Sequence, residues 1–375
     1  MSFSERILKN NERAIYSLRA LYKDHGYSYF KVSKFEEYDL YAHNKSFLVS
    51  NNILTFTDTN GKLLALKPDV TLSIIKNISD SDGSVHKLCY NETVYRTSAD
   101  SDGFREIMQT GLECIGDIDT YSECEVVMLA AKSLGTISEE YILDISHMGL
   151  LEGFLDECGF DEALQNDLIK LVESKNIHAI RELLSKNGVD QNVEEALCFM
   201  TSLYCPIDEA LTSIKPYVCG AKMEKAYGDL VNISACQKLY GVADKLYLDL
   251  SIVNDVNYYD GICFKGYING IPDSVLSGGR YDKLLVRLGK HMGAIGFAVY
   301  LDRLERHGAN RVEYDVDTAL IYEKGTAIEK IVQAQTAIMA EGVSVLVGSA
   351  PDRSQSYRRL LKITDGGIEV LEDND

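Results

Sequence analysis

The sequence has no long hydrophobic run, no signal-peptide core and no closely spaced cysteine pair. No stretch reaches the roughly 18 apolar residues that a membrane-spanning helix needs. The first residues, MSFSERILKNNERAIYSL, are charged from the start and do not resemble a signal peptide. The nine cysteines include no Cys-x-x-Cys pair, which argues against a zinc site and a disulfide framework. We therefore expect a cytoplasmic protein whose reduced thiols pack as small apolar groups.

Positive charge is also scarce. Lysine and arginine together number 38, aspartate and glutamate 57, and the formal net charge is −19. Nucleic-acid binding takes much of its free energy from cationic side chains that displace counterions from phosphates. The nearest basic group, Arg353 with Arg358 and Arg359, is modest, although a local patch on an acidic chain can bind RNA. We expect no tRNA partner.

Nucleotide and metal fingerprints are missing as well. The sequence contains neither a Walker nor a Rossmann glycine motif, and its seven histidines show no metal-ligand spacing. We therefore expect no cofactor and no metal site.

The pattern of apolar residues predicts an α+β fold in two parts. After one N-terminal helix, short alternating segments separated by Gly and Asp-Gly turns predict an antiparallel sheet flanked by helices. Residues from about 150 to 244 are typical of consecutive helices, a helical insertion between two parts of the sheet. We place the large domain at residues 1–310 and a small α/β unit at 311–375. In the small unit the sequence predicts strand TALIY, helix TAIEKIVQAQTAIMAEG, strand VSVLVG, a short helix near Ser354 to Leu361, and strand GIEVLE.

One segment has a polar and an apolar face. In KLCYNETVYRTSADSDGFREIMQTGLECIG, the returning strand places Arg105, Gln109 and Glu113 on one face and apolar side chains on the other. This arrangement suits a ligand-binding sheet, and it suits equally an ordinary sheet with one solvated face.

A second segment, residues 246–282, joins an alternating strand, a tyrosine pair and a glycine-rich turn. Its parts VNDVNYYDGICFKGY and SGGRYDKLL resemble the histidine-specific signature of the histidyl-tRNA synthetase family. The polar-faced segment resembles the second motif of class II synthetases, and GAIGFAVYLDRL, residues 293–304, resembles the third. The resemblance runs in order over residues 1 to about 310 and implies a class II aminoacyl-tRNA synthetase-like fold.

The resemblance implies a histidine-like pocket. Tyr258 and Tyr259 match the tyrosine pair that lines the imidazole pocket of the family, with Gln109 and Glu113 beside them. A tyrosine hydroxyl and a carboxylate can each hydrogen-bond an imidazole nitrogen. Paired tyrosines are also common core residues in a chain with 23 tyrosines.

Three further residues complete the implied ligand set. LALKPDVTLSIIKN resembles a family segment in which a glutamate binds the amino group of histidine; Asp69 stands in its place, with Thr71 two positions later. Asp69 would equally serve as the N-cap of the following helix, and both roles can coexist. Arg96 matches the family arginine that holds the ATP α-phosphate, a task that suits a planar donor group.

Departures from the family pattern remove groups that handle ATP. Asn254 replaces an arginine that contacts phosphate and carboxylate, Ser98 replaces a glutamate, and Tyr300 replaces a small glycine near the adenine. The connecting loop carries Asp100 and Asp102, whose charges would repel a polyphosphate.

Other positions are less decisive. Arg303 matches the nucleotide arginine of the third motif, or forms an ordinary ion pair with Asp302 or Glu305. The first motif lacks its interface proline near Ser33, and the C-terminal unit is shorter than the anticodon-binding domain of the family.

These departures imply the non-aminoacylating branch of the family, the regulatory subunits of ATP phosphoribosyltransferase in histidine biosynthesis. The resemblance then implies no catalytic residue in this chain, a hetero-oligomer with a short-form catalytic ATP phosphoribosyltransferase subunit, and feedback regulation by histidine. It also implies a homodimer through the synthetase-like core. Two alternatives stay open: a divergent synthetase that forms histidyl-adenylate, and a tRNA-binding adaptor, which the acidic charge disfavours.

Overall fold

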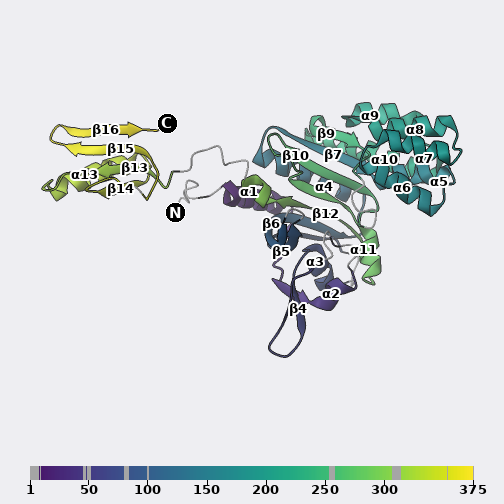
Figure 1. Cartoon of the computed structure of the whole chain (residues 1–375), viewed down its shortest axis with the longest axis horizontal. Coiled ribbons are helices and arrows are strands. Elements are labelled where there is room, and N and C mark those ends of the chain that lie inside the picture. The colour runs from purple at the N-terminus through teal and green to yellow at the C-terminus, as the bar shows by residue number, and fades with distance from the viewer. Residues whose placement is uncertain are drawn as a thin grey trace. The chain divides into compact units, whose positions relative to one another are not determined.

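The computed structural model describes residues 8, 10–44, 48, 52–79, 84–98, 101–252, 258–305, 314–352 and 354–374. The chain forms two compact units, Met1–Gly308 and Ala309–Asp375 (Figure 1). Asn254 and Asp100, two of the predicted departures from the family pattern, lie outside the described residues.

A mixed sheet forms the centre of the first unit. Within the described residues it has nine strands, in the order β1-β5-β6-β12-β11-β10-β7-β9-β8. Their bounds are β1 Ser28–Tyr29, β5 His86–Ser98, β6 Ser101–Gly116, β12 Gly293–Tyr300, β11 Leu276–Arg280, β10 Ile262–Ile268, β7 Tyr141–His147, β9 Leu246–Asp249 and β8 Tyr204–Pro206. The pairs β1·β5 and β7·β9 are parallel, and the other pairs are antiparallel. The predicted α+β class with a largely antiparallel sheet is confirmed.

Two long helices pack against one face of this sheet. They are α1 (Asn10–Asp24) and α4 (Thr120–Ile137), which contact strands near the middle of the sheet. The sequence places an N-cap before α4, since the Asp119 carboxylate accepts a hydrogen bond of 2.8 Å from the Ser122 amide. Burial of most of the α4 residues makes this helix the centre of the main hydrophobic core.

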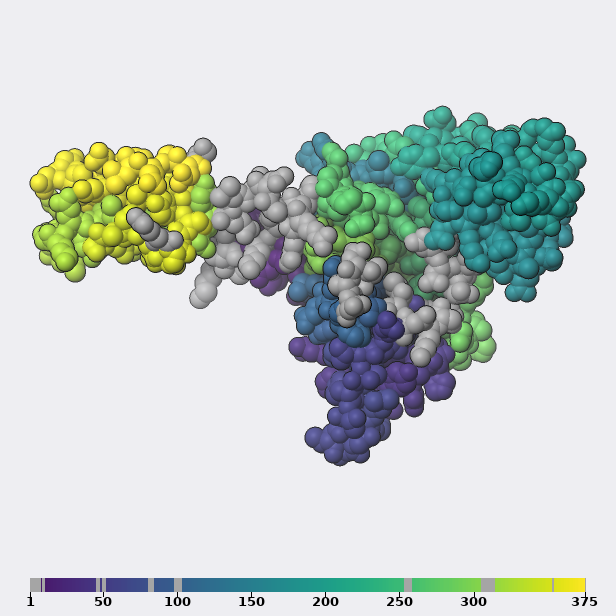
Figure 2. Space-filling model, in the orientation of Figure 1, coloured from purple at the N-terminus to yellow at the C-terminus, as the bar shows by residue number. Residues whose placement is uncertain are grey.

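The other face is covered by smaller elements. A three-stranded sheet has the order β2-β4-β3, with β2 Phe35–Glu37, β4 Leu63–Leu66 and β3 Thr55–Thr57. The β3–β4 hairpin projects from the first unit as a narrow extension (Figure 2). Helices α2 (Tyr38–Ala42), α3 (Thr71–Asn77) and α11 (Asp282–Arg287) share a second core cluster with β5 and β12.

The predicted helical insertion contains α5 Met148–Glu157, α6 Glu162–Glu173, α7 Ile177–Lys186, α8 Gln191–Ser202, α9 Ile207–Ile214 and α10 Gly220–Tyr240. It is not purely helical, because β8 lies between α8 and α9 and pairs with β9. None of the helices in the described ranges is both long enough and apolar enough to cross a bilayer.

The second unit has a sheet ordered β14-β13-β15-β16, with β14 Val345–Gly348, β13 Val316–Ile321, β15 Tyr357–Thr364 and β16 Gly367–Asp373. Helix α13 (Ile328–Ala340) joins β13 to β14. The short helix predicted near Ser354 to Leu361 is wrong, because β15 occupies most of that segment. A register shift between Leu360 and Leu361 buries two consecutive leucines, so the strand loses the alternation that would have identified it.

Candidate functional site

A cavity of about 410 Å³ lies on the face of the main sheet opposite α4, over β6, β12, β11 and β10. Directly opposed residues of antiparallel strands project to the same face, so the register defines its floor. Glu113 opposes Gly296, and Ala298 opposes Ser277. Because small residues occupy the middle strands, the sheet leaves room there for a ligand. All seven predicted ligand residues line this one cavity: Asp69, Thr71, Arg96, Gln109, Glu113, Tyr258 and Tyr259.

Glu113 lies at one end of the floor and is only 2% exposed. One carboxyl oxygen accepts a hydrogen bond of 2.7 Å from the Thr71 hydroxyl, and the other accepts one from the Tyr281 hydroxyl. A Cβ atom on Gly296 would lie 1.8 Å from Glu113 Oε2, so only glycine leaves space for this carboxyl group. Burial raises the pKa of Glu113 to about 8, although both hydroxyl donors oppose the shift. Near neutral pH the group is therefore largely a neutral acid.

Asp69 contacts the start of α3 and also faces the cavity. Its carboxylate accepts a 2.9 Å hydrogen bond from the Leu72 amide at the start of α3, and it lines the cavity as well. Burial raises its pKa, and the positive charge of Arg96 partly offsets the effect. The Arg96 Nε atom donates to the Pro68 carbonyl oxygen at 2.8 Å, which orients the guanidinium beside Asp69.

Tyr258, Tyr259 and Tyr281 line one side of the cavity and are called the tyrosine wall. The ring centroids of Tyr258 and Tyr259 are 4.8 Å apart in an edge-to-face pair, and Tyr281 lies 5.6 Å from Tyr258. A Cβ on Gly279 would come within 2.6 Å of the Tyr259 ring, so a glycine at this position leaves room for the ring. The glycine-rich turn predicted here is wrong, because Gly279 lies in strand β11.

Gln109 offers an unused donor to a ligand. Its side chain is 3% exposed, and within the described residues its Nε2 atom has no hydrogen-bond partner. A buried amide without a partner costs free energy, which a bound acceptor would recover. Arg105, predicted on the same face of the strand, is exposed and does not line the cavity.

Tyr300 and Arg303 lie at the end of the β6–β12 floor remote from Glu113. The Tyr300 hydroxyl lies 2.6 Å from Ser277 Oγ, and the Arg303 guanidinium lies 4.5 Å from the centroid of the Tyr300 ring. Arg303 also donates to the carbonyl oxygen and the hydroxyl of Ser274. Of the two interpretations left open for Arg303, its place in the cavity favours a ligand-facing role over a surface ion pair.

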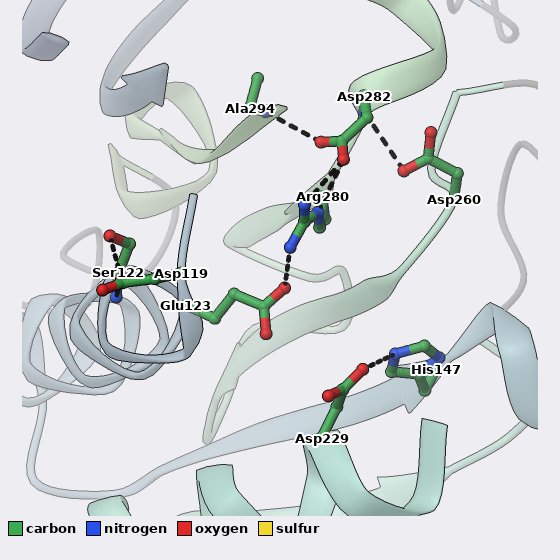
Figure 3. A network of polar contacts seen from close by, with 9 residues as sticks. All are labelled: Asp119, Ser122, Glu123, His147, Asp229, Asp260, Arg280, Asp282 and Ala294. Carbon is green, nitrogen blue, oxygen red and sulfur yellow. Dashed lines mark hydrogen bonds and ion pairs between the residues drawn. The ribbon is translucent and has the colours of Figure 1, made fainter. Parts of the chain in front are cut away.

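A network of charged residues links the end of β11 to α4 and to the start of α11 (Figure 3). Arg280 donates to Glu123 of α4 at 2.6 Å and through two nitrogens to Asp282 at 2.8 and 2.9 Å. The Asp260 carboxylate, directly after Tyr259, accepts hydrogen bonds from the backbone amides of Asp282 and Lys283 at 3.2 and 2.5 Å. The network therefore fixes the turn that carries Tyr259 against the start of α11.

The sequence interpretation missed Tyr281 as a site residue. It lies in SGGRYDKLL, which was interpreted as a glycine turn entering a helix, and only the register of the sheet brings its hydroxyl to Glu113. No group of three or more His, Cys, Asp or Glu side chains in the described ranges is arranged to hold a metal ion.

Comparison with known proteins agrees with this fold. The family model for histidyl-tRNA synthetase matches residues 3–304. Curated relatives named ATP phosphoribosyltransferase regulatory subunit include one from Caldanaerobacter subterraneus, which is 31% identical over 294 residues, 76% of this chain and 75% of its own length.

Two solved structures are similar as well. One is an ATP phosphoribosyltransferase regulatory subunit/histidyl-tRNA synthetase from Bacillus halodurans, with a TM-score of 0.75, 23% identity, and coverage of 94% of this chain and 93% of that chain. The other belongs to an ATP phosphoribosyl transferase (HisG:HisZ) complex from Thermotoga maritima, with a TM-score of 0.62, 22% identity, and coverage of 78% and 97%. The chain therefore belongs to the histidyl-tRNA synthetase family and, within it, to the ATP phosphoribosyltransferase regulatory subunits.

Proposed function

We propose that this chain binds a catalytic ATP phosphoribosyltransferase subunit and reports the histidine concentration to it through the cavity between Glu113 and Tyr300. The observation that carries the proposal is the convergence of all seven predicted ligand residues on one cavity. Membership of the regulatory-subunit family supports the partner, and the named complex among the similar structures supports a hetero-oligomer.

The groups in the cavity complement free histidine from end to end. Glu113 offers a hydrogen-bonding group to an imidazole ring beside the tyrosines, and Gln109 offers an amide donor to the ligand farther along the floor. Asp69 offers a carboxylate to the ammonium group, and Arg96 offers a planar cation to the carboxylate of the amino acid. A neutral Glu113 can donate a hydrogen bond to one nitrogen of a neutral imidazole, so the ring need not carry a charge into a buried site.

Feedback regulation requires that histidine bind two states of the assembly with different affinity. In this proposal the state that orders the tyrosine wall around histidine is the one in which the catalytic partner is less active. A tenfold difference in histidine affinity between the two states corresponds to about 1.4 kcal/mol of coupling free energy.

Isothermal titration calorimetry of the isolated chain with L-histidine tests the site. We expect Glu113→Ala and Tyr259→Ala to weaken binding at least tenfold, because each removes a wall of the imidazole pocket. Tyr121→Ala serves as the matched control, since Tyr121 is an exposed tyrosine on α4. Equal affinity of all four proteins would refute the proposed site.

The partner requires a separate assay. Phosphoribosyl transfer by the short-form catalytic subunit should rise when this chain is added and fall again with histidine. The Glu113→Ala variant should still activate phosphoribosyl transfer, but histidine should no longer inhibit the activated complex. A chain that instead catalyses histidine-dependent pyrophosphate exchange with ATP would be the divergent synthetase. Light scattering of the isolated chain tests the proposed homodimer.

A further inference from the structure

The floor of the cavity has a length that the sheet register defines. On β6, Glu113 and Gln109 both face the cavity and are four residues apart, which corresponds to about 13 Å of strand. Tyr300 opposes Gln109 across the β6–β12 ladder, so its Cα lies at the end of the floor remote from Glu113.

The side chain of Tyr300 reaches back over this floor. Its hydroxyl bonds to Ser277, which opposes Ala298 and not Tyr300 itself. The ring therefore leans toward Glu113 by about two residues, roughly 7 Å of strand. It occupies about half of the length of the floor.

The position of the ring is fixed on two sides. The hydrogen bond to Ser277 holds the hydroxyl, and the Arg303 guanidinium covers the ring at 4.5 Å. Arg303 is itself anchored by the carbonyl oxygen and hydroxyl of Ser274. Beyond the ring the cavity continues along Lys265 and Asp302, and Asp302 Oδ1 is a buried atom without a hydrogen-bond partner among the described residues.

We propose that Tyr300 sets the length of the ligand: it is an end wall that confines the cavity to a single amino acid and excludes derivatives extended at the carboxyl group. This inference rests on the proposed histidine site, because the imidazole is placed at Glu113. Because Glu113 lies at one end of the floor, the carboxyl end of such a ligand points away from Glu113 and toward the Gln109 row, which Tyr300 adjoins on β12.

Calorimetric titration with two probes of different length tests the wall. L-histidinamide and L-histidine β-naphthylamide both lack the free carboxylate, and only the second carries a bulky extension. We expect the wild-type chain to bind the naphthylamide at least tenfold more weakly than the amide. Tyr300→Ala should bind the naphthylamide at least as well as the amide, because the second half of the floor is then open. Tyr300→Phe is the matched control and should behave as wild type, since the ring remains under Arg303.

The outcomes separate this inference from the proposed function. The role of Tyr300 as an end wall is refuted if wild type binds the amide more tightly than the naphthylamide and the Tyr300→Ala variant shows the same preference. The variant must give the circular dichroism spectrum of a folded protein for this comparison. Tyr300→Leu repeats the test should the alanine variant fail to fold. If wild type does not bind L-histidine, the histidine site is refuted, and a gain of naphthylamide binding in Tyr300→Ala alone would still support the wall. Absence of naphthylamide binding in every variant refutes the wall.

Discussion

Replacement of Glu113 by glutamine should change how the stability of this protein depends on pH. The pKa of Glu113 rises from 4.5 to about 8 on folding because the carboxyl group is buried. Above the lower value the unfolded chain releases this proton while the folded chain keeps it, so rising pH favours unfolding until the folded group also ionises. The contribution of Glu113 to the free energy of unfolding is therefore most favourable below pH 4.5. It becomes less favourable as the pH rises and levels off above about pH 8.

The magnitude follows from the size of the shift. Each pKa unit corresponds to 1.36 kcal/mol, so Glu113 destabilises the fold by at most about 5 kcal/mol at high pH relative to low pH. Between pH 5.5 and pH 9 the change is about 3 kcal/mol. Glutamine has nearly the same shape and can still accept from the Thr71 hydroxyl and donate to the Tyr281 oxygen, yet it does not titrate.

Urea denaturation at both pH values, followed by tyrosine circular dichroism, measures the difference, since the chain has no tryptophan. Between pH 5.5 and pH 9, we expect the free energy of unfolding of Glu113→Gln to fall by about 3 kcal/mol less than that of wild type. Glu224→Gln, at an exposed position of α10, should follow wild type. Parallel pH profiles for wild type and Glu113→Gln would show that Glu113 ionises normally and that the reasoning from its burial is wrong.

Three further substitutions probe other parts of the site. Gly296→Ala places a Cβ 1.8 Å from Glu113 Oε2, so it should lower the free energy of unfolding by about 1–3 kcal/mol and weaken histidine binding, as urea denaturation and calorimetry would measure. Lys67→Met removes the cation 2.5 Å from the largely buried Glu92 and should cost about 3 kcal/mol; Glu92→Gln in the same chain should recover part of it in a double-mutant cycle. Arg280→Lys cannot reproduce the guanidinium bonds to both carboxylate partners, and we expect a loss of about 2 kcal/mol in thermal denaturation together with weaker histidine binding. An unchanged histidine affinity in Arg280→Lys would show that the charged network does not position the tyrosine wall.

Much of the fold could be predicted because its signals are local. The alternation of Leu246, Leu248 and Leu250 indicates a strand, and β9 begins at Leu246, although it ends at Asp249. The second unit shows the limit of such signals: the bulge at Leu360 replaces the period of a strand with a buried pair that resembles a helix face. The short β8 was missed for a different reason, since a three-residue strand between helices has no period to detect.

The sequence predicted which residues belong to the candidate site, but it did not predict how their side chains contact one another. Resemblance to a family identified side chains from segments far apart in the sequence, and the structure brings those side chains around one cavity. The contacts that decide their chemistry depend on strand register. Examples are the hydroxyl of Tyr281 on Glu113 and the reach of Tyr300 back to Ser277, neither of which a local pattern encodes.

The lengths of the two outer strands limit how this sheet can interact with other chains. Of the described strands, β1 at one edge has two residues, and β8 at the other edge has three and ends in Pro206, which has no amide hydrogen to donate. Both outer strands are therefore poor templates for strand addition. β5, next to β1, is much longer, and β1 pairs with it only at Leu88 and Cys89, so a partner that adds a strand at this side of the sheet would have to pair with the remaining part of β5.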